Sequence, residues 1–242
     1  KNGFCRTAKS INGAFCSKRI AMDNSFILSF LSDLAEHNNR TWFALNKGRY
    51  LNAVDLFTKE VADFIVHIAQ FDNNVQYLRP KDCIFRIYRD IRFSPDKSPY
   101  KRHFGAYIAP KGGRRSSFGG YYLHIEPGNS VLCGGIFCPD KTHLRMLRTA
   151  VDENFNEFRH IIENRNFTKQ FDGIYSPEVL QRIPVGFSSE SPATEYLKNK
   201  HFSIAHYLSD DEMCKADFFE TTLEIFHSMK PFNDFCNEAL EL

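Results

Sequence analysis

Apolar residues recur at helical spacing in the first part of the chain. The capping side chains of Asp23-Asn24-Ser25 precede an apolar run that predicts a helix ending near His37. The next apolar stripe, from Phe43 to Ile68, covers one face of a predicted helix of about thirty residues, and Gly48 inside it predicts a kink. The chain therefore begins with two amphipathic helices.

Helical spacing returns in the second half of the chain. Residues 144–162 carry one apolar stripe, and the capping box Ser209-x-x-Glu212 precedes another that ends near Phe226. We expect Pro231 to begin a last short helix, because proline is favoured in a first helical turn.

Between these helices the apolar period changes to two. The predicted strands are 83–90, 103–109, 119–126, 129–137 and, as a fifth, 201–208. Their connections are mostly short and turn-rich, such as Pro127-Gly128-Asn129, whereas a parallel crossover needs about a dozen residues or more. We predict a single α+β domain, in which an antiparallel sheet of four to five strands packs with N-terminal and C-terminal helices.

Composition sets the limits of this domain. With 43% hydrophobic residues the chain can bury a large core, and we place the domain at residues 22–242, with residues 1–21 as an N-terminal extension. Seven cysteines without a Cys-x-x-Cys pair are typical of reduced thiols in a cytoplasmic protein. No apolar run approaches about 18 residues, so we expect no membrane span.

Charge is concentrated in one segment. Residues 79–115 hold eleven Lys or Arg against three Asp, although the net charge of the whole chain is only +2. Within it, the four cations Arg86, Arg89, Arg92 and Lys97 suggest a clamp for phosphate or carboxylate, because guanidinium groups bind such anions through paired hydrogen bonds. Alternatively, Asp90 and Asp96 pair with these cations and fasten the loop against the sheet.

Strand alternation predicts which side chains share a face of the sheet. If the first three strands are neighbours, one face collects Arg86, Tyr88, Asp90, His103, Tyr107, Tyr122, His124 and Glu126. A face of this kind, covered by a helix or loop, would form a polar pocket with aromatic walls.

His124 and Glu126 lie two residues apart on that face. This spacing suits a general acid–base pair or two metal ligands, with His103 as a third ligand from another strand. The favoured interpretation of each is a hydrogen-bonded sheet residue, and we assign no metal. No nucleophile elbow, Walker loop or dinucleotide fingerprint is present in the sequence.

The charged segment also carries a family resemblance. The pattern Arg86-x-x-Arg89-Asp90-x-Arg92-Phe93-x-x-x-Asp96-Lys97-x-x-Tyr100 resembles the signature of the bacterial domain of unknown function 2461 family. Residues 120–127, 134–136, 180–187 and 197–202 extend the likeness over roughly residues 23 to 225, and Val185 departs from it where a basic residue is expected. The resemblance implies a domain and a motif, and no activity or cofactor.

Three functions remain open from the sequence. The favoured one is binding of, or action on, a small anionic ligand, with Arg86, Arg89, Arg92, Lys97, Tyr100 and Tyr122 as ligand-binding residues and Asp90, His124 and Glu126 as catalytic residues. The alternatives are a nucleic-acid-binding module, supported by the aromatic residues within the basic segment, and a protein-interaction module. In the last two, the motif is a structural ion-pair network. The oligomeric state is not predicted.

Overall fold

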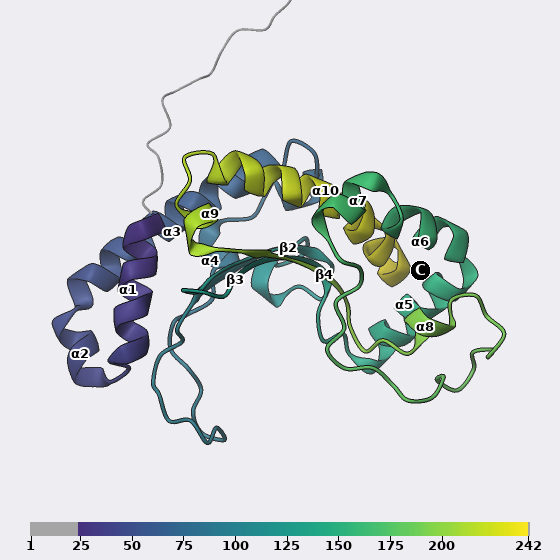
Figure 1. The fold of residues 1–242 in the computed structure, drawn as a ribbon, viewed down its shortest axis with the longest axis horizontal. Coiled ribbons are helices and arrows are strands. Elements are labelled where there is room, and N and C mark those ends of the chain that lie inside the picture. The colour runs from purple at the N-terminus through teal and green to yellow at the C-terminus, as the bar shows by residue number, and fades with distance from the viewer. Residues whose placement is uncertain (1–23, 242) are drawn as a thin grey trace, which may run out of the picture.

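A four-stranded antiparallel sheet forms the centre of the structure, a computed structural model that describes residues 24–241 (Figure 1). The strands are β1 (Phe104–Ile108), β2 (Gly120–Ile125), β3 (Ser130–Ile136) and β4 (Phe202–Leu208), and they lie in the order β1-β2-β3-β4. The prediction of one α+β domain with an antiparallel sheet is confirmed. The extension predicted at residues 1–21 lies outside the described residues.

Helices account for most of the remaining chain. The α-helices are α1 (Asn24–Glu36), α2 (Arg40–Leu45), α3 (Lys47–Ile68), α4 (Pro80–Cys83), α5 (Lys141–Glu153), α6 (Phe155–Ile162), α7 (Arg165–Gln170), α8 (Thr194–Leu197), α9 (Asp210–Met213) and α10 (Phe218–Glu241), and two 3₁₀ turns are η1 (Asn73–Val75) and η2 (Gly113–Arg115). Among residues 24–241, no helix combines the length and apolar character needed to cross a bilayer.

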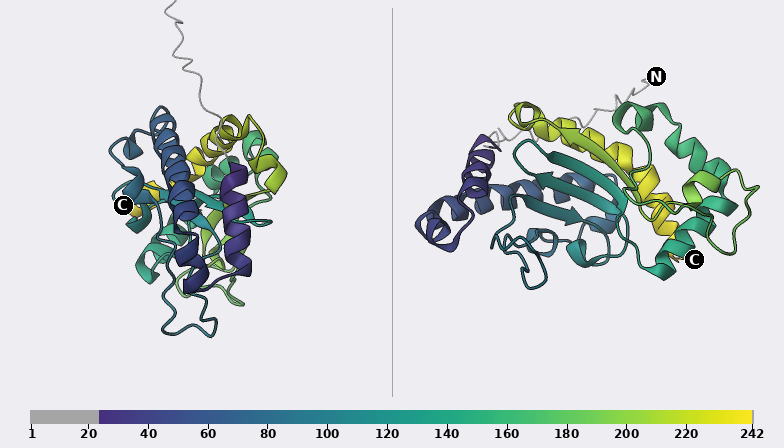
Figure 2. Two further views of the ribbon diagram at one scale, coloured as in Figure 1. Left: turned by 90° about the vertical axis from the view of Figure 1, so that its left-hand side faces the viewer. Right: turned by 60° about the horizontal axis from the view of Figure 1, so that its bottom comes forward.

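The sheet has one covered face. Tyr121, Leu123 and Ile125 alternate along β2 and are fully buried, as the period of two predicts. The Tyr121 ring lies 5.5 Å from that of Phe226 on α10, and the Phe226 ring lies 5.6 Å from that of Phe64 on α3. Figure 1 shows α3 and α10 together on this side of the sheet. Figure 2 shows the strands from the opposite side, where much of the sheet is not covered by helices.

The helices break at polar residues that the apolar stripes do not mark. The predicted long helix divides at Asn46, whose side chain donates to the Trp42 carbonyl oxygen at 3.0 Å, and not at Gly48. The predicted helix 144–162 likewise divides at Asn154. Pro231 lies inside α10 and does not begin a new helix, so that prediction was wrong.

The first predicted strand, 83–90, was also wrong in detail. Pro80 begins the short helix α4, which takes up Cys83, and the following residues form isolated bridges, Ile84 to Ala106 and Tyr88 to Tyr100. The segment still runs antiparallel to the chain on either side of Phe104, because the Phe85 amide donates to the Gly105 carbonyl oxygen at 2.9 Å. Prolines 95 and 99 lack amide donors, so a continuous ladder cannot form.

Two glycines of β3 allow α10 to pack closely on the sheet. Asn233 of α10 is 1% exposed; it accepts a hydrogen bond from the Gly135 amide at 2.6 Å and donates to the Gly120 carbonyl oxygen at 3.1 Å. A Cβ atom at Gly134 would lie 3.0 Å from the Met229 sulfur, and one at Gly135 would overlap the Phe202 carbonyl oxygen. The strand ends and the helix are therefore fixed to each other.

We predict that Gly135→Ala destabilises the protein far more than Gly128→Ala. Both glycines have positive φ angles, 78° and 70°, which costs a non-glycine residue about 1–3 kcal/mol. Only Gly135 adds an overlap, with Phe202 and with the Phe232 ring at 2.6 Å, whereas nothing lies within 4 Å of a Cβ at Gly128. Urea unfolding should show an additional loss of about 1–3 kcal/mol at Gly135. Equal losses at both positions would contradict this packing.

Candidate functional site

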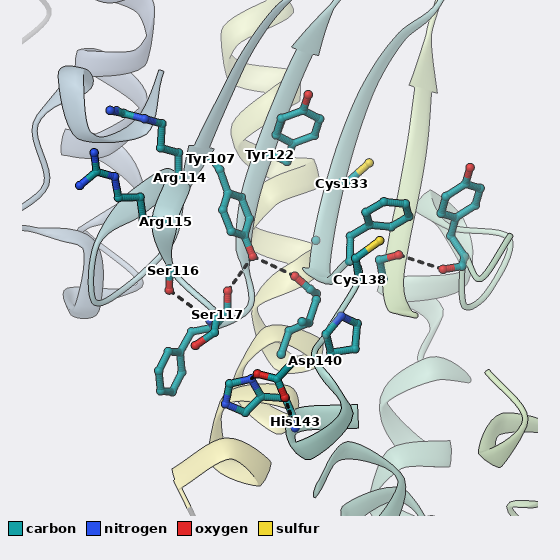
Figure 3. A pocket seen from close by; sticks show the side chains of 18 of the residues that line it. Tyr107, Arg114, Arg115, Ser116, Ser117, Tyr122, Cys133, Cys138, Asp140 and His143 are labelled. Atoms are coloured by element: carbon teal, nitrogen blue, oxygen red, sulfur yellow. Dashed lines mark hydrogen bonds and ion pairs between the residues drawn. The ribbon is translucent and has the colours of Figure 1, made fainter. Parts of the chain in front are cut away.

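A cavity of about 660 Å³ lies against the uncovered face of the sheet (Figure 3). Its floor consists of Tyr107 from β1, Tyr122 from β2 and Cys133 from β3, and its rim comes from two loops, residues 114–118 and 136–140, with His143 of α5 beside them. The volume is within the range of about 300–1,000 Å³ typical of small-molecule sites. The cavity is the first element of the candidate site.

Register explains how the two tyrosines meet on the floor. Tyr107 and Tyr122 are directly paired across β1 and β2, and Cys133 is the partner of Tyr122 on the other side. Tyr107 donates to the carbonyl oxygens of Phe118 at 2.6 Å and Gly135 at 3.1 Å, which links the floor to both rim loops (Figure 3). The phenol of Tyr107 therefore has a structural role.

Tyr122 connects the cavity to a line of polar side chains. Its hydroxyl lies 2.9 Å from Nδ1 of His124, and Nε2 of His124 lies 3.1 Å from Oε2 of Glu126. Asn129 donates to the same Glu126 oxygen at 3.0 Å. The absence of a side chain at Gly105 leaves room for the Tyr122 hydroxyl, because a Cβ there would lie only 2.8 Å from it.

His103 completes the cluster from the segment before β1. Its ring centroid lies 4.1 Å from that of His124, with an angle of 32° between the rings. The structure thus brings together His103, Tyr107, Tyr122, His124 and Glu126, the part of the predicted polar face that lies on or next to the regular strands. His103, His124 and Glu126 together can hold a metal ion.

Burial controls the protonation of this cluster. It lowers the pKa of His103 to about 4, with a further contribution from His124, and it also lowers the pKa of His124. Burial alone would raise the pKa of Glu126, but the hydrogen bonds from His124 and Asn129 outweigh it and the pKa lies below its usual value. Both imidazoles are therefore neutral and the carboxylate is charged at neutral pH.

The cysteines of the cavity differ in reactivity. Burial raises the pKa of the Cys133 thiol to about 12, so it stays protonated at neutral pH. Cys138 is exposed and has a φ of 54°, which is uncommon for a residue other than glycine. Its amide donates to Nδ1 of His201 at 3.0 Å, a contact that helps hold this conformation.

The Arg86–Tyr100 segment forms a loop that extends away from the sheet (Figure 1). Arg89 lies at its base, with hydrogen bonds to the Asp96 carboxylate at 2.5 Å, the Ser98 carbonyl oxygen at 3.2 Å and the Ser94 hydroxyl at 3.2 Å. Asp96 also accepts from the backbone and side chain of Ser98, and these bonds together with Arg89 hold its pKa well below the usual range. Arg89 therefore closes the loop.

The other charged residues of the motif also pair locally. Arg92 donates to both oxygens of Asp90, at 2.9 and 2.6 Å, and this lowers the pKa of Asp90. Lys97 donates to the Ile91 carbonyl oxygen at 3.1 Å, and Arg86 is exposed beside Asp90. None of these residues lines the cavity described above.

Tyr100 is buried and packs within the fold. Its ring stacks on Phe43 at 3.9 Å between centroids, and the Asn38 side chain binds both its amide and its carbonyl oxygen. Of the residues expected to bind ligand, the structure places Tyr122 in the cavity and the others in or beside the loop.

Sequence reasoning missed most of the cavity rim. Arg114 and Arg115 line one end, and Phe137, Cys138 and Asp140 line another part. The basic glycine turn at residues 111–115 is the signal in the sequence that points to the first group. No pattern in the sequence indicated Phe137, Cys138 and Asp140 as cavity residues. In the structure Asp140 is the N-cap of α5 and accepts hydrogen bonds from the amides of Thr142 and His143.

We predict that Arg89→Ala opens the loop and that Arg92→Ala does not. Arg89 joins three points of the loop, whereas Arg92 contacts a residue two positions away. Chymotrypsin should cleave after Phe93, which is 93% exposed, at least about fivefold faster in Arg89→Ala, since cleavage follows the population of the opened segment. Cleavage after the exposed Tyr77 is the internal control. Equal rates in both variants would contradict a closing role of Arg89.

Comparison with known proteins identifies the family and no activity. No curated protein and no solved structure matches the chain. A family model described as "Conserved hypothetical protein (DUF2461)" matches residues 26–235, which run from the third residue of α1 through all four strands to Phe235 within α10. The chain belongs to the DUF2461 family.

Proposed function

We propose that the chain binds a small molecule with a flat apolar body and an anionic group in the cavity on the uncovered sheet face. The observation that carries this proposal is the lining of the cavity, in which aromatic and apolar side chains surround a few polar groups. The proposal keeps the anionic ligand class expected from the sequence and moves its site from the motif to the cavity.

The apolar part of the ligand is matched by aromatic walls. Phe85, Phe118 and Phe137 come from three separate segments and line the cavity together with the two floor tyrosines. Phe137 is 59% exposed and stacks on His201 at 4.5 Å. An exposed aromatic side chain at a cavity rim gains contact area when a ligand covers it, so apolar burial favours binding.

The anionic part is matched by the arginine end. Arg114 is held by a hydrogen bond from its guanidinium to the Lys81 carbonyl oxygen, and the adjacent Arg115 is exposed. Within residues 24–241, no carboxylate lies within ion-pair distance of either guanidinium. Asp140, by contrast, caps α5 and pairs with His143 at 3.1 Å. Figure 3 shows both guanidinium groups at the outer edge of the cavity, directed away from Tyr107, so this charge difference would hold an anionic group at the mouth of the cavity on the Arg115 side.

Tyr122 is the polar group on the floor of the cavity. Burial raises the pKa of its phenol, so the hydroxyl stays protonated and acts as a hydrogen-bonding group. Its bond to His124, which is held by Glu126, fixes the direction of that hydroxyl. Because this hydroxyl donates its one proton to Nδ1 of His124, it can only accept a further hydrogen bond, so a ligand with a donor group near the floor would be recognised at this point.

The motif is better explained as a structural ion-pair network. Arg89, Arg92 and Lys97 each have a partner inside the loop, and the pairs connect residues two to nine positions apart. This agrees with the structural alternative considered from the sequence. The two ion pairs also engage two of the eleven cations of the basic segment, Arg89 and Arg92, which the nucleic-acid alternative would need for phosphate contacts.

We predict that anilinonaphthalene sulfonate binds the native protein more tightly than phenylnaphthylamine, the same ring system without the sulfonate. Arg115→Ala should weaken binding of the sulfonate by about fivefold, which corresponds to about 1 kcal/mol for an exposed charge pair, and leave the neutral compound unaffected. Fluorescence titration measures both. Arg92→Ala is the matched control, because it removes an exposed arginine of the motif. Loss of binding in Arg92→Ala with retention in Arg115→Ala would place the site in the motif.

Ligand protection of a thiol locates the site independently. Cys138 lines the cavity and Cys214 follows α9, and both are exposed. We expect the bound sulfonate to slow iodoacetamide alkylation of Cys138 and not of Cys214, as measured by peptide mass spectrometry. Equal protection of both thiols, or of neither, would overturn the assignment of the ligand to this cavity.

A further inference from the structure

Three side chains with metal-binding groups converge next to the cavity. Ligand atoms of His103, His124 and Glu126 lie within 4.8 Å of one another. His124 and Glu126 project on the same side of the sheet because two residues separate them. His103 directly precedes β1, in which Phe104 pairs with Ile125 and Gly105 with His124. The sheet register therefore brings donors from two strands together.

His103 has no other evident role in the structure. Within residues 24–241, no group forms a hydrogen bond with either nitrogen of its ring, although the side chain is half-buried and stacks on His124. The ring nitrogens of His103 are therefore available to a ligand without the loss of a hydrogen bond within the protein. A bound cation would give one of them a partner next to the ring of His124.

The carboxylate of Glu126 has an oxygen available to a metal ion. Its two hydrogen bonds, from His124 and Asn129, both fall on Oε2, which leaves Oε1 for a further contact. The cluster thus offers imidazole nitrogens from two histidines and one carboxylate oxygen.

We propose that His103, His124 and Glu126 form a binding site for one divalent transition-metal ion of the zinc type. Two imidazoles and one carboxylate are a donor set that such ions prefer, and three protein ligands leave a coordination position for water or another small molecule. Calcium and magnesium are disfavoured, since they select oxygen ligands.

The geometry requires a small adjustment. Donor atoms on a tetrahedral zinc ion are about 3.4 Å apart, as follows from metal–ligand distances of about 2.0–2.1 Å. Rotation of the His103 and Glu126 side chains would close the present 4.8 Å spread. His124 would bind through Nε2, the nitrogen that now faces Glu126, and Nδ1 would then donate a hydrogen bond to the Tyr122 hydroxyl.

The positive charge of Lys101 disfavours a metal ion at this site, so its removal should change the metal affinity in a defined direction. Its charge contributes to the lowered pKa of both His103 and His124, and its ammonium group lies 5.2 Å from the centroid of the Phe85 ring. A positive charge that disfavours a protonated imidazole also disfavours a metal cation there. Lys101→Met should therefore strengthen metal binding, which is the opposite of the effect expected for a variant that only damages the fold.

The experiment uses the full chain after treatment with a chelator and its removal, titrated with Co²⁺ and Zn²⁺. We expect one equivalent of Co²⁺ to give weak visible bands without the intense near-ultraviolet absorption of cobalt–thiolate bonds, and calorimetry with Zn²⁺ to show the same stoichiometry. His103→Ala and Glu126→Gln should weaken binding by more than about tenfold, and Tyr122→Phe, which removes an outer partner, by about tenfold. His160→Ala is the control, because His160 is an exposed histidine on α6.

Several results would overturn the proposal. They are the absence of a cobalt spectrum in the wild-type protein, a spectrum dominated by thiolate bands, or equal affinity in wild type, His103→Ala and Glu126→Gln. Far-ultraviolet circular dichroism of each variant confirms that the fold is kept. The titration contains no organic ligand, so the metal site and the ligand cavity succeed or fail separately.

Discussion

The close packing of α10 on the ends of β2 and β3 is the interaction on which the rest of the structure depends. Asn233 binds a backbone group of each strand, and four residues later Asn237 binds the amide and the carbonyl oxygen of Gly119. Gly134 and Gly135 leave the space that this approach needs, and the positive φ of Gly135 changes the direction of the chain at the end of β3. The residues after that turn form part of the cavity rim, so a contact on the covered face shapes the uncovered one.

Local periodicity was sufficient to predict the four strands of the sheet and the residues on their faces, although it also predicted a strand at 83–90 that does not form. The period of two located β1 to β4, and it predicted that Tyr107, Tyr122 and His124 share a side of the sheet. It could not predict the cavity, because Phe85, Phe118 and Phe137 converge from segments that are distant in sequence. Helix ends were missed for a related reason. The apolar stripes continue on both sides of Asn46 and Asn154, where one helix ends and the next begins. The spacing of apolar residues therefore does not show where the helix is interrupted.

The charged motif shows how sequence clustering differs from a binding site. Cations and carboxylates a few residues apart can reach one another as soon as the chain turns, and the two proline steps cause it to turn here. The pairs of Arg89 with Asp96 and Arg92 with Asp90 follow from this proximity. The donors at His103 and His124 come from separate strands, and only a tertiary register can bring them within reach of each other.

The isolated bridges on both sides of the sheet have a consequence for self-association. A regular edge strand presents unpaired amides and carbonyl groups that can bind the edge of another molecule. Here Ile84 bridges Ala106 at the β1 edge, and Tyr175 bridges Ser203 at the β4 edge. Each is an isolated bridge, and neither segment continues as a strand of the sheet. Because these segments occupy part of each sheet edge, they hinder the addition of a strand from another molecule. One face of the sheet can therefore stay uncovered while intermolecular sheet formation is disfavoured.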